Sequence, residues 1–341
     1  MIFYLVTSAH FYTTDAYLQS WGKPLASRVK VLFYENLATT KQLPCGTYIF
    51  SDIERLDPAE AELAAQVWQD LANAPYGLRL LNHPTRSMRR YELLRTLHKQ
   101  GYNKFNIYAL TELQTPQSFP VFIRGENDHG GNLTPLLHTP EELDAAIHDL
   151  DRQGKSKNDK VIVEFCDTSS QDGTFRKYSA FIVGDEVIPT HMFFSGDWVT
   201  KVEKVGEMNN AMLQEERQFV EENPHESQLR KIAQIARINY GRIDYAVLNG
   251  EIQIWEINTN PMMPRLSFGG ASREPVLQYS TQRLNNALAA INCQLSPEIQ
   301  IKISTKPQRL KRLGKTLLPF VPPQYSLFVR RRLRRETQAE T

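Results

Sequence analysis

Three oxygen-bearing side chains lie close together in the stretch GRIDYAVLNGEIQIWEINTNP, residues 241–261. Asp244 precedes an Asn-Gly turn signal, and Glu256 and Asn258 follow it on the returning strand. Because side chains two apart point to the same face of a strand, these two residues should share a face with the nearby isoleucines. A carboxylate on an apolar face is costly unless it is compensated, and a bound cation would compensate it.

The register of this predicted hairpin decides whether the two acids meet. A two-residue turn at the Asn-Gly pair would set Asp244 against Trp255 and leave Glu256 on the other face. A three-residue turn over residues 249–251 would instead set Asp244 directly opposite Glu256, with Cβ atoms about 4.5–5.5 Å apart. Two carboxylates at that distance repel each other unless a proton or a metal lies between them.

The donor set of this hairpin indicates which metal would fit. Carboxylate and amide oxygens without nitrogen or sulfur favour a hard cation such as Mg²⁺, which fills its other positions with water and phosphate oxygens. The alternative is a hairpin whose acids face water, since surface carboxylates are common. The apolar neighbours and the abrupt end of the strand at NTNP favour the metal site.

The composition is that of a globular protein. The chain has 341 residues, which suggests two or three domains, with 41% hydrophobic and 23% charged residues. No apolar run approaches the roughly 20 residues of a membrane span, and the first residues read as a buried strand rather than a signal peptide. Cys45, Cys166 and Cys293 lie too far apart for a disulfide framework or a Cys-based zinc site. The expected compartment is the cytoplasm.

The charge is unevenly distributed. The net charge is +2, yet the segment from Lys302 to Arg335 holds eleven Lys and Arg and no acid, so an acidic body carries a basic tail. The tail mixes aromatic residues with arginines, which suits an acidic partner or an anionic membrane surface. It could equally pack on the body and keep the protein soluble. Specific nucleic-acid binding is not expected, because no recognised module is present.

The order of the predicted elements indicates an α/β (α+β) protein. Strands and helices alternate in the first part, where Asp57 can cap a helix that begins at Pro58. A capping box at Thr139 begins a later helix, and a hairpin turns at Gly184. The expected units are an open N-terminal α/β domain over residues 1–115, two further units over residues 116–185 and 186–300, and a basic tail over residues 301–341.

The common catalytic signatures are missing. LGKT at 313–316 resembles the end of a phosphate-binding loop, but Arg309 occupies the position where that motif requires glycine. The sequence has no G-x-G-x-x-G, G-x-S-x-G, H-E-x-x-H or C-x-x-C pattern.

Asp244, then Glu256, Asn258 and Pro261, resemble the metal-binding pattern of the ATP-grasp superfamily. Its members include D-alanine–D-alanine ligases, glutathione synthetases and ribosomal-protein glutamate ligases. The resemblance covers roughly residues 80–265. It includes FPVFIRG…HGG as the strand and glycine-rich loop over the phosphates, VIVEFC as the hinge strand, and RKYSAFIVGDEVI as the following hairpin. It implies an ATP-grasp fold behind a pre-ATP-grasp N-terminal domain.

The resemblance implies a role for each matching residue. Glu256 would bridge two Mg²⁺ ions, or Mn²⁺, and Asp244 and Asn258 would complete their coordination. The other implied residues are Glu164, Phe165 and Cys166 at adenine, Arg124 and His129 at phosphates, Arg176 and Lys201 at phosphates or substrate, and Arg242 and Arg265 at the reacting groups.

This chain departs from the family pattern at two of these positions. Arg124 stands where the family usually has lysine, which keeps the charge with a different geometry. The usual ribose-binding acid is missing before Arg176, and Asp167 or Asp172 could replace it. For Lys201 and Arg242 the alternative is a solvated surface charge, and for His129 a turn histidine without a role.

The implied activity is that of an ATP- and Mg²⁺-dependent carboxylate–amine ligase. A substrate carboxylate would be activated as an acyl phosphate and joined to an amine or a thiol, releasing ADP and phosphate. Two alternatives share the scaffold: a phosphotransferase that acts on a hydroxyl, and a non-catalytic ATP-binding or partner protein. The partners expected are ATP, a carboxylate substrate, an amine and, as a further option, a second copy of the chain.

Overall fold

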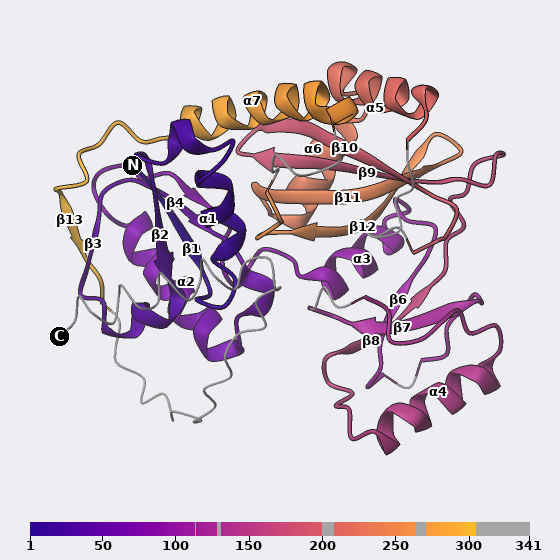
Figure 1. Cartoon of the computed structure of the whole chain (residues 1–341). Coiled ribbons are helices and arrows are strands. Elements are labelled where there is room, and N and C mark those ends of the chain that lie inside the picture. The colour runs from indigo at the N-terminus through magenta and orange to yellow at the C-terminus, as the bar shows by residue number, and fades with distance from the viewer. Residues whose placement is uncertain (113, 128–130, 200–207, 264–270, 305–341) are drawn as a thin grey trace.

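The computed structural model describes residues 1–112, 114–127, 131–199, 208–263 and 271–304. Within these ranges the chain combines a parallel sheet with antiparallel sheets and covering helices (Figure 1), which confirms the mixed fold class expected from the sequence. His129, Lys201, Arg265 and the tail from residue 305 lie outside the described residues, so the expected partner of the tail stays a prediction.

An open parallel sheet of order β2-β1-β4-β5 forms the N-terminal unit. Its strand β1 (Ile2–Val6) is buried along its whole length, as expected for an apolar strand inside a parallel sheet. Helix α2 (Pro58–Ala72) begins at a capping box in which Asp57 and Glu60 accept each other's backbone N–H at 2.8 and 3.0 Å. The other elements here are β2 (Val29–Phe33), β4 (Thr47–Phe50), β5 (Leu80–Leu81), α1 (Tyr12–Leu18) and 3₁₀ turns at Lys23–Leu25, Tyr34–Thr39 and Ile53–Arg55.

A central antiparallel sheet of order β10-β9-β11-β12 follows in the middle of the chain. Strands β9 (Phe175–Val183) and β10 (Glu186–Ser195) form the predicted hairpin, and Gly184 in its turn has a positive φ of +63°. Helices α5 (Asn210–Glu222) and α6 (Glu226–Ala236) pack their apolar residues against this sheet in one hydrophobic core. Part of the opposite face lines a cavity, with Lys177, Asp244 and Glu256 among the lining residues.

The hairpin of β11 (Tyr240–Leu248) and β12 (Glu251–Asn258) turns differently from the prediction. Leu248 pairs with Glu251, so the turn has two residues rather than three. Asn249 and Gly250 have φ values of +53° and +81°, which are typical of a type I′ turn, whose twist matches that of the strands. The predicted three-residue turn is therefore wrong.

A β-bulge nevertheless brings the two acids together. Tyr245 pairs with Ile254 and Asp244 pairs with Glu256, so Trp255 is the extra residue. Because adjacent residues on a strand point to opposite faces, Ile254 lies on the helix-covered face with Tyr245, and Glu256 lies on the other face with Asp244. The expected meeting of the acids is confirmed, but the expectation that Glu256 shares a face with the neighbouring isoleucines is wrong.

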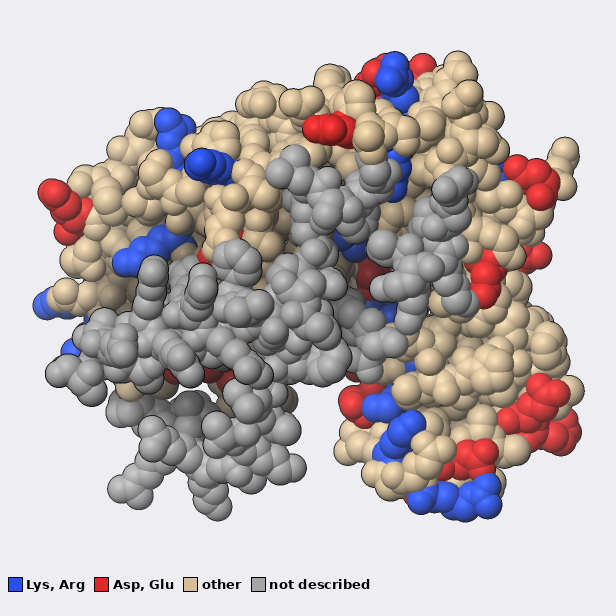
Figure 2. Space-filling model, in the orientation of Figure 1, with Lys and Arg blue, Asp and Glu red and all other residues tan. Residues whose placement is uncertain are grey.

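A smaller antiparallel sheet of order β6-β8-β7 lies beside the central one. It consists of β6 (Ile107–Ala109), β7 (Val121–Gly125) and β8 (Lys160–Glu164), covered by α4 (Pro140–Arg152). The Thr139 hydroxyl caps α4, as predicted, by accepting the Glu142 N–H at 3.2 Å. Figure 2 shows acidic and basic side chains interspersed over this unit, so this face of it carries no patch of a single charge.

Three connections join these units. Helix α7 (Glu274–Ala290), preceded by a 3₁₀ turn at Ala271–Arg273, runs along both the N-terminal and the central sheets (Figure 1) and packs into a core shared by them. Strand β13 (Gln300–Lys302) returns to pair with β3 (Gln42–Pro44). Helix α3 (Arg90–Lys99) packs against the inner edge of the central sheet. In the described part of the chain, no helix combines the length and apolarity that crossing a membrane requires.

Candidate functional site

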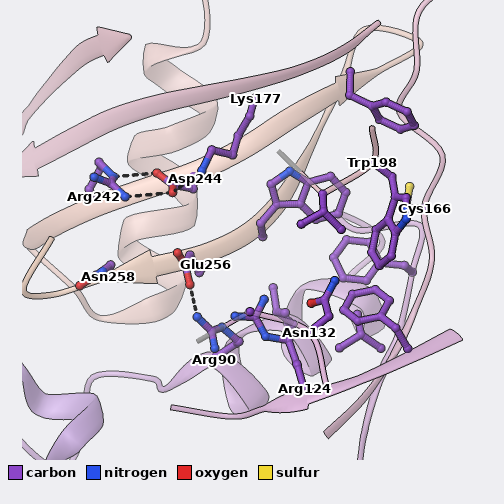
Figure 3. Close-up of a pocket in the computed structure, with 18 of the residues that line it drawn as sticks. Arg90, Arg124, Asn132, Cys166, Lys177, Trp198, Arg242, Asp244, Glu256 and Asn258 are labelled. Carbon is purple, nitrogen blue, oxygen red and sulfur yellow. Dashed lines mark hydrogen bonds and ion pairs between the residues drawn. The ribbon is translucent and has the colours of Figure 1, made fainter. Parts of the chain in front are cut away.

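A cavity of about 420 Å³ lies between the central sheet and the small sheet, with the loop after β1 at its rim. Figure 3 shows its two ends. Asp244, Glu256 and Asn258 lie at one end with nearby cations, and aromatic side chains, among them Trp198, surround the other. The bulge at Trp255 places Glu256 on the same face as Asp244, and both acids line this space.

The aromatic end is a narrow apolar slot. The ring of Trp198 lies 5.0 Å from that of Phe122 and 5.6 Å from that of Phe165, measured between centroids. Cys166 also lines the slot, and burial raises the pKa of its thiol to about 11, so the group is neutral and apolar in character at physiological pH. At these distances the rings pack against one another, and a flat ring system can pack against the part of this cluster that lines the cavity.

The Glu164 carboxylate holds the strand at the base of this slot. It accepts hydrogen bonds from the Tyr108 hydroxyl at 2.8 Å and from the backbone N–H groups of Asn106, Gln117 and Ser118 at 2.8, 2.9 and 3.0 Å. A carboxylate this fully engaged fixes the surrounding backbone. Glu164 therefore shapes the slot by ordering the chain around it.

At the polar end, Asp244 is held by two cations and a hydroxyl. Arg242 donates from Nε and Nη2 to its two oxygens at 2.7 and 3.0 Å, Ser179 donates at 2.9 Å, and the Lys177 Nζ lies 3.3 Å away. Burial by itself would raise the pKa of the Asp244 carboxyl, but Arg242 and Lys177 lower it far below its ordinary value. Asp244 is therefore ionised at neutral pH.

Glu256 and Asn258 are anchored separately. Arg90, from the start of α3, forms an ion pair with the Glu256 carboxylate across the cavity (Figure 3). The side-chain oxygen of Asn258 accepts the backbone N–H of Asn260 at 2.9 Å. Each oxygen-bearing side chain of the pattern is thus held at the cavity wall by a partner of its own.

The residues around Asp244 fit a hard divalent cation in the chemistry of their donors. Asp244 and Glu256 oppose each other, and Asn258 adds an amide oxygen. Among the described residues no cluster of three or more His, Cys, Asp and Glu side chains is close enough to hold a metal alone. The two carboxylates and the amide are a partial set of oxygen ligands of the kind that Mg²⁺ completes with phosphates and water.

The NTNP segment after β12 connects this end of the cavity to the N-terminal unit. Thr259 accepts the Ile53 N–H at 3.2 Å and donates its hydroxyl proton to Glu54. The Asn260 side-chain oxygen accepts from the hydroxyls of Tyr4 at 3.0 Å and Thr13 at 2.8 Å. The N-terminal loops are therefore fixed relative to the strand that carries Glu256.

All of the predicted site residues that lie in the described part of the chain line this one cavity. They are Arg124, Glu164, Phe165, Cys166, Arg176, Arg242, Asp244, Glu256 and Asn258. Arg176 is held by carboxylates, at 3.0 Å from Asp172 and 2.8 Å from Glu215. Asp172, one of the two acids considered for the ribose, is thus an ion-pair partner of Arg176.

Among the lining residues that sequence reasoning missed are Arg90, Lys177 and Trp198. Arg90 had a detectable signal, because it precedes Leu94 and Leu97 by four and seven positions on the buried stripe of α3. Lys177 shares a face of β9 with Ser179, and Ser179 pairs with Asp244 on β11. The sequence does not reveal that β9 pairs with β11, so it could not place Lys177 next to Asp244. Trp198 follows β10 in a loop without a periodic pattern.

No family model matches the sequence, and neither does any curated protein. Among solved structures, a D-cycloserine synthetase superposes with a TM-score of 0.50 at 14% identity, covering 84% of this chain and 100% of that one. The VanG D-Ala:D-Ser ligase of Enterococcus faecalis gives 0.49 at 13% identity (85% and 98% covered), and the D-alanine–D-alanine ligase of Bacillus anthracis 0.45 at 13% (84% and 99%). At 14% identity the likeness to the synthetase speaks for the fold alone: the chain has the ATP-grasp fold.

Proposed function

We propose that the protein is an ATP- and Mg²⁺-dependent ligase that activates a carboxylate and joins it to an amine. The observation that carries this proposal is the cavity itself, in which an apolar slot of aromatic rings faces a pair of opposed carboxylates surrounded by cations. A nucleotide has the same division into a flat base and a charged phosphate chain. When bound, ATP with Mg²⁺ supplies the phosphoryl group that makes a carboxylate reactive.

Each part of the cavity has a role in this proposal. The slot of Phe122, Phe165 and Trp198 packs on the adenine. Lys177 and Arg124 neutralise phosphate oxygens. The oxygens of Asp244, Glu256 and Asn258 hold Mg²⁺.

In this proposal Arg242 positions the Asp244 carboxylate, with which it forms an ion pair. It forms two hydrogen bonds with Asp244, and its Nη1 donates to the Met262 carbonyl at 3.3 Å. These contacts fix the carboxylate in one orientation at the cavity wall. Arg242 therefore supports the metal site from the strand that carries Asp244, and its positive charge adds to the field that favours phosphate.

Thermal melting tests the nucleotide site without knowledge of the substrate. The melting temperature of the full chain is measured with Mg²⁺ alone, ATP alone and both together. A ligand at a hundredfold its dissociation constant adds about 2.7 kcal/mol of stability. We expect stabilisation that requires both components in the wild type and is lost in Glu256→Gln. Glu251→Gln is the matched control, because Glu251 lies on the same strand but pairs with Lys104 in solvent. Equal stabilisation of both variants would contradict the proposed site.

Hydroxylamine trapping tests the ligase chemistry. The enzyme is incubated with ATP, Mg²⁺ and hydroxylamine together with each of the proteinogenic amino acids, D-alanine, succinate or glutarate. An activated carboxylate yields a hydroxamate together with ADP and phosphate. A stable phosphorylated product formed in its place would favour the phosphotransferase, and stabilisation by ATP without any product would favour the non-catalytic alternative.

A further inference from the structure

The loop after β1 carries a histidine to the rim of the cavity. His10 lines the same space as Glu256 and Asn258, and its side chain is 29% exposed. Its backbone carbonyl accepts a hydrogen bond from the Asn260 side chain at 3.2 Å, and the Asn260 N–H in turn donates to Asn258. His10 is therefore fixed relative to the residues assigned to the metal, on the side of the cavity away from the aromatic slot.

A hydrogen-bonded chain orients the His10 ring. Its Nδ1 lies 2.8 Å from the Thr7 hydroxyl oxygen and 3.4 Å from an oxygen of Asp52. The Thr7 hydroxyl donates its single proton to that Asp52 carboxylate. It can therefore only accept from His10, and the carboxylate is likewise an acceptor. Both neighbours of Nδ1 require a proton on that nitrogen, so the neutral ring carries its lone pair on Nε2.

The buried surroundings of Asp52 keep its carboxylate in place beside the His10 ring. Its side chain is fully buried, and its backbone has a left-handed φ of +57°, which glycine, asparagine and aspartate adopt more readily than most residues. Burial would raise the pKa of its carboxyl, but hydrogen bonds from His10 and Thr7 and the charge of Arg55 lower it below its ordinary value. A buried anion therefore lies behind the imidazole, on the side of its Nδ1.

We propose that His10 is the general base that takes a proton from the amine nucleophile, with Asp52 and Thr7 as positioning residues. This rests on the proposed ligase function. The amine lone pair forms the C–N bond to the activated carbonyl, and the nitrogen thereby becomes positively charged. One N–H proton passes to the His10 Nε2, the C–O bond to phosphate breaks with its electron pair, and inorganic phosphate leaves. The imidazolium that results is stabilised by the Asp52 carboxylate through Nδ1.

The first test reads the tautomer directly and needs no substrate. The full chain is labelled with ¹⁵N-histidine, and two-bond ¹H–¹⁵N correlations are recorded, with His10→Gln used to assign the His10 signals. The neutral ring should be protonated on Nδ1 in the wild type and in Thr7→Ser. The Nδ1–H form should become less populated in Thr7→Val and in Asp52→Asn, whose new residue tolerates the left-handed φ. A wild-type ring protonated on Nε2 would overturn the proposal.

The second test separates the two half-reactions. With a carboxylate that yields hydroxamate, the rate with hydroxylamine is compared with the rate of amide formation from the panel of amino acids. Hydroxylamine is mostly unprotonated near neutral pH and needs less help from a base. In His10→Gln we expect amide formation to fall by about 10²–10⁴-fold and hydroxamate formation to fall far less. His148→Gln, on the exposed face of α4, is the control and should change neither rate.

The outcomes separate this proposal from the one on which it rests. A wild type that yields no hydroxamate from any acid of the panel overturns the ligase function and the base role with it. A wild type that makes both products, with His10→Gln lowering both rates equally or neither, overturns only the role of His10.

Discussion

Asp244 and Glu256 face each other across two strands, yet each carboxylate is bound by a different arginine. Arg242 comes from the same strand as Asp244, and Arg90 comes from the start of α3. Two opposed acids would repel each other if left alone, and these cations neutralise them. The site is thus an assembled set of opposite charges, in which a cation binding to the acids would compete with side chains already in place.

Removing Arg242 should destabilise the fold. Arg242→Met would leave the buried Asp244 carboxylate with only Lys177 and Ser179, and breaking a buried ion pair typically costs about 3 kcal/mol. Urea unfolding measures the loss. The double variant Arg242→Met with Asp244→Asn should recover most of it, because the buried carboxylate that lost its arginine is then gone. Additive losses in the double variant would show that the pair is not coupled.

Removing Arg90 should strengthen the binding of a metal ion at Glu256. Arg90 pairs with Glu256, so a metal at Glu256 must compete with the guanidinium. Arg90→Met should tighten the binding of Mn²⁺, followed by electron paramagnetic resonance in the absence of nucleotide, by about tenfold. Arg86→Met, an exposed change just before the same helix, is the control and should leave the affinity unchanged. Weaker binding in Arg90→Met would mean that Arg90 organises the site rather than competing for it.

Periodic and capping patterns were sufficient to predict much of the fold. The caps at Asp57 and Thr139 and the hairpin at Gly184 follow from residues adjacent in the sequence, which is why local reasoning found them. The bulge at Trp255 could not be predicted from the sequence. It depends on how β12 packs on β11, and the sequence pattern there is equally compatible with an unbroken strand.

Part of the candidate site could likewise be predicted from the sequence, and part of it could not. The oxygen-bearing residues could be named because their types and spacing are unusual on one hairpin. Arg90 shows in the sequence only as a position on the buried stripe of α3. His10 could not be assigned to the site, because it reaches the cavity from a distant element whose position is set by tertiary packing. The link through Asn260 that fixes His10 spans 250 positions of the sequence.

Glu54 should make stability depend on pH in a defined direction. Burial and the nearby charge of Asp52 raise the pKa of its carboxyl above the ordinary value of 4.5, and its Oε1 is buried. A raised pKa in the folded state stabilises the protein below pH 4.5, and this contribution is lost as pH rises through the folded value. Glu54→Gln keeps an acceptor for Thr259 without the charge. It should therefore unfold at higher urea than the wild type at pH 7 and at the same urea near pH 4.

Glu62→Gln, exposed on α2, should show no such difference. An unchanged midpoint of Glu54→Gln at pH 7 would contradict the raised pKa.

The two-residue turn that sets the register before the bulge can be tested through its glycine. Gly250 has a φ of +81°. Apart from its chain neighbours, no atom of the described residues lies within 4 Å of the position that an alanine methyl group would take, so alanine there meets only backbone strain. Gly250→Ala should lower the free energy of unfolding by about 1 kcal/mol, whereas Asn249→Gly should be nearly neutral. Gly196→Ala is the matched control, because Gly196 has equal space around it without a positive φ, and there alanine should be neutral or slightly stabilising. Equal effects at the two glycines would mean that the turn is not of type I′, and the register that brings Asp244 opposite Glu256 would then need another cause.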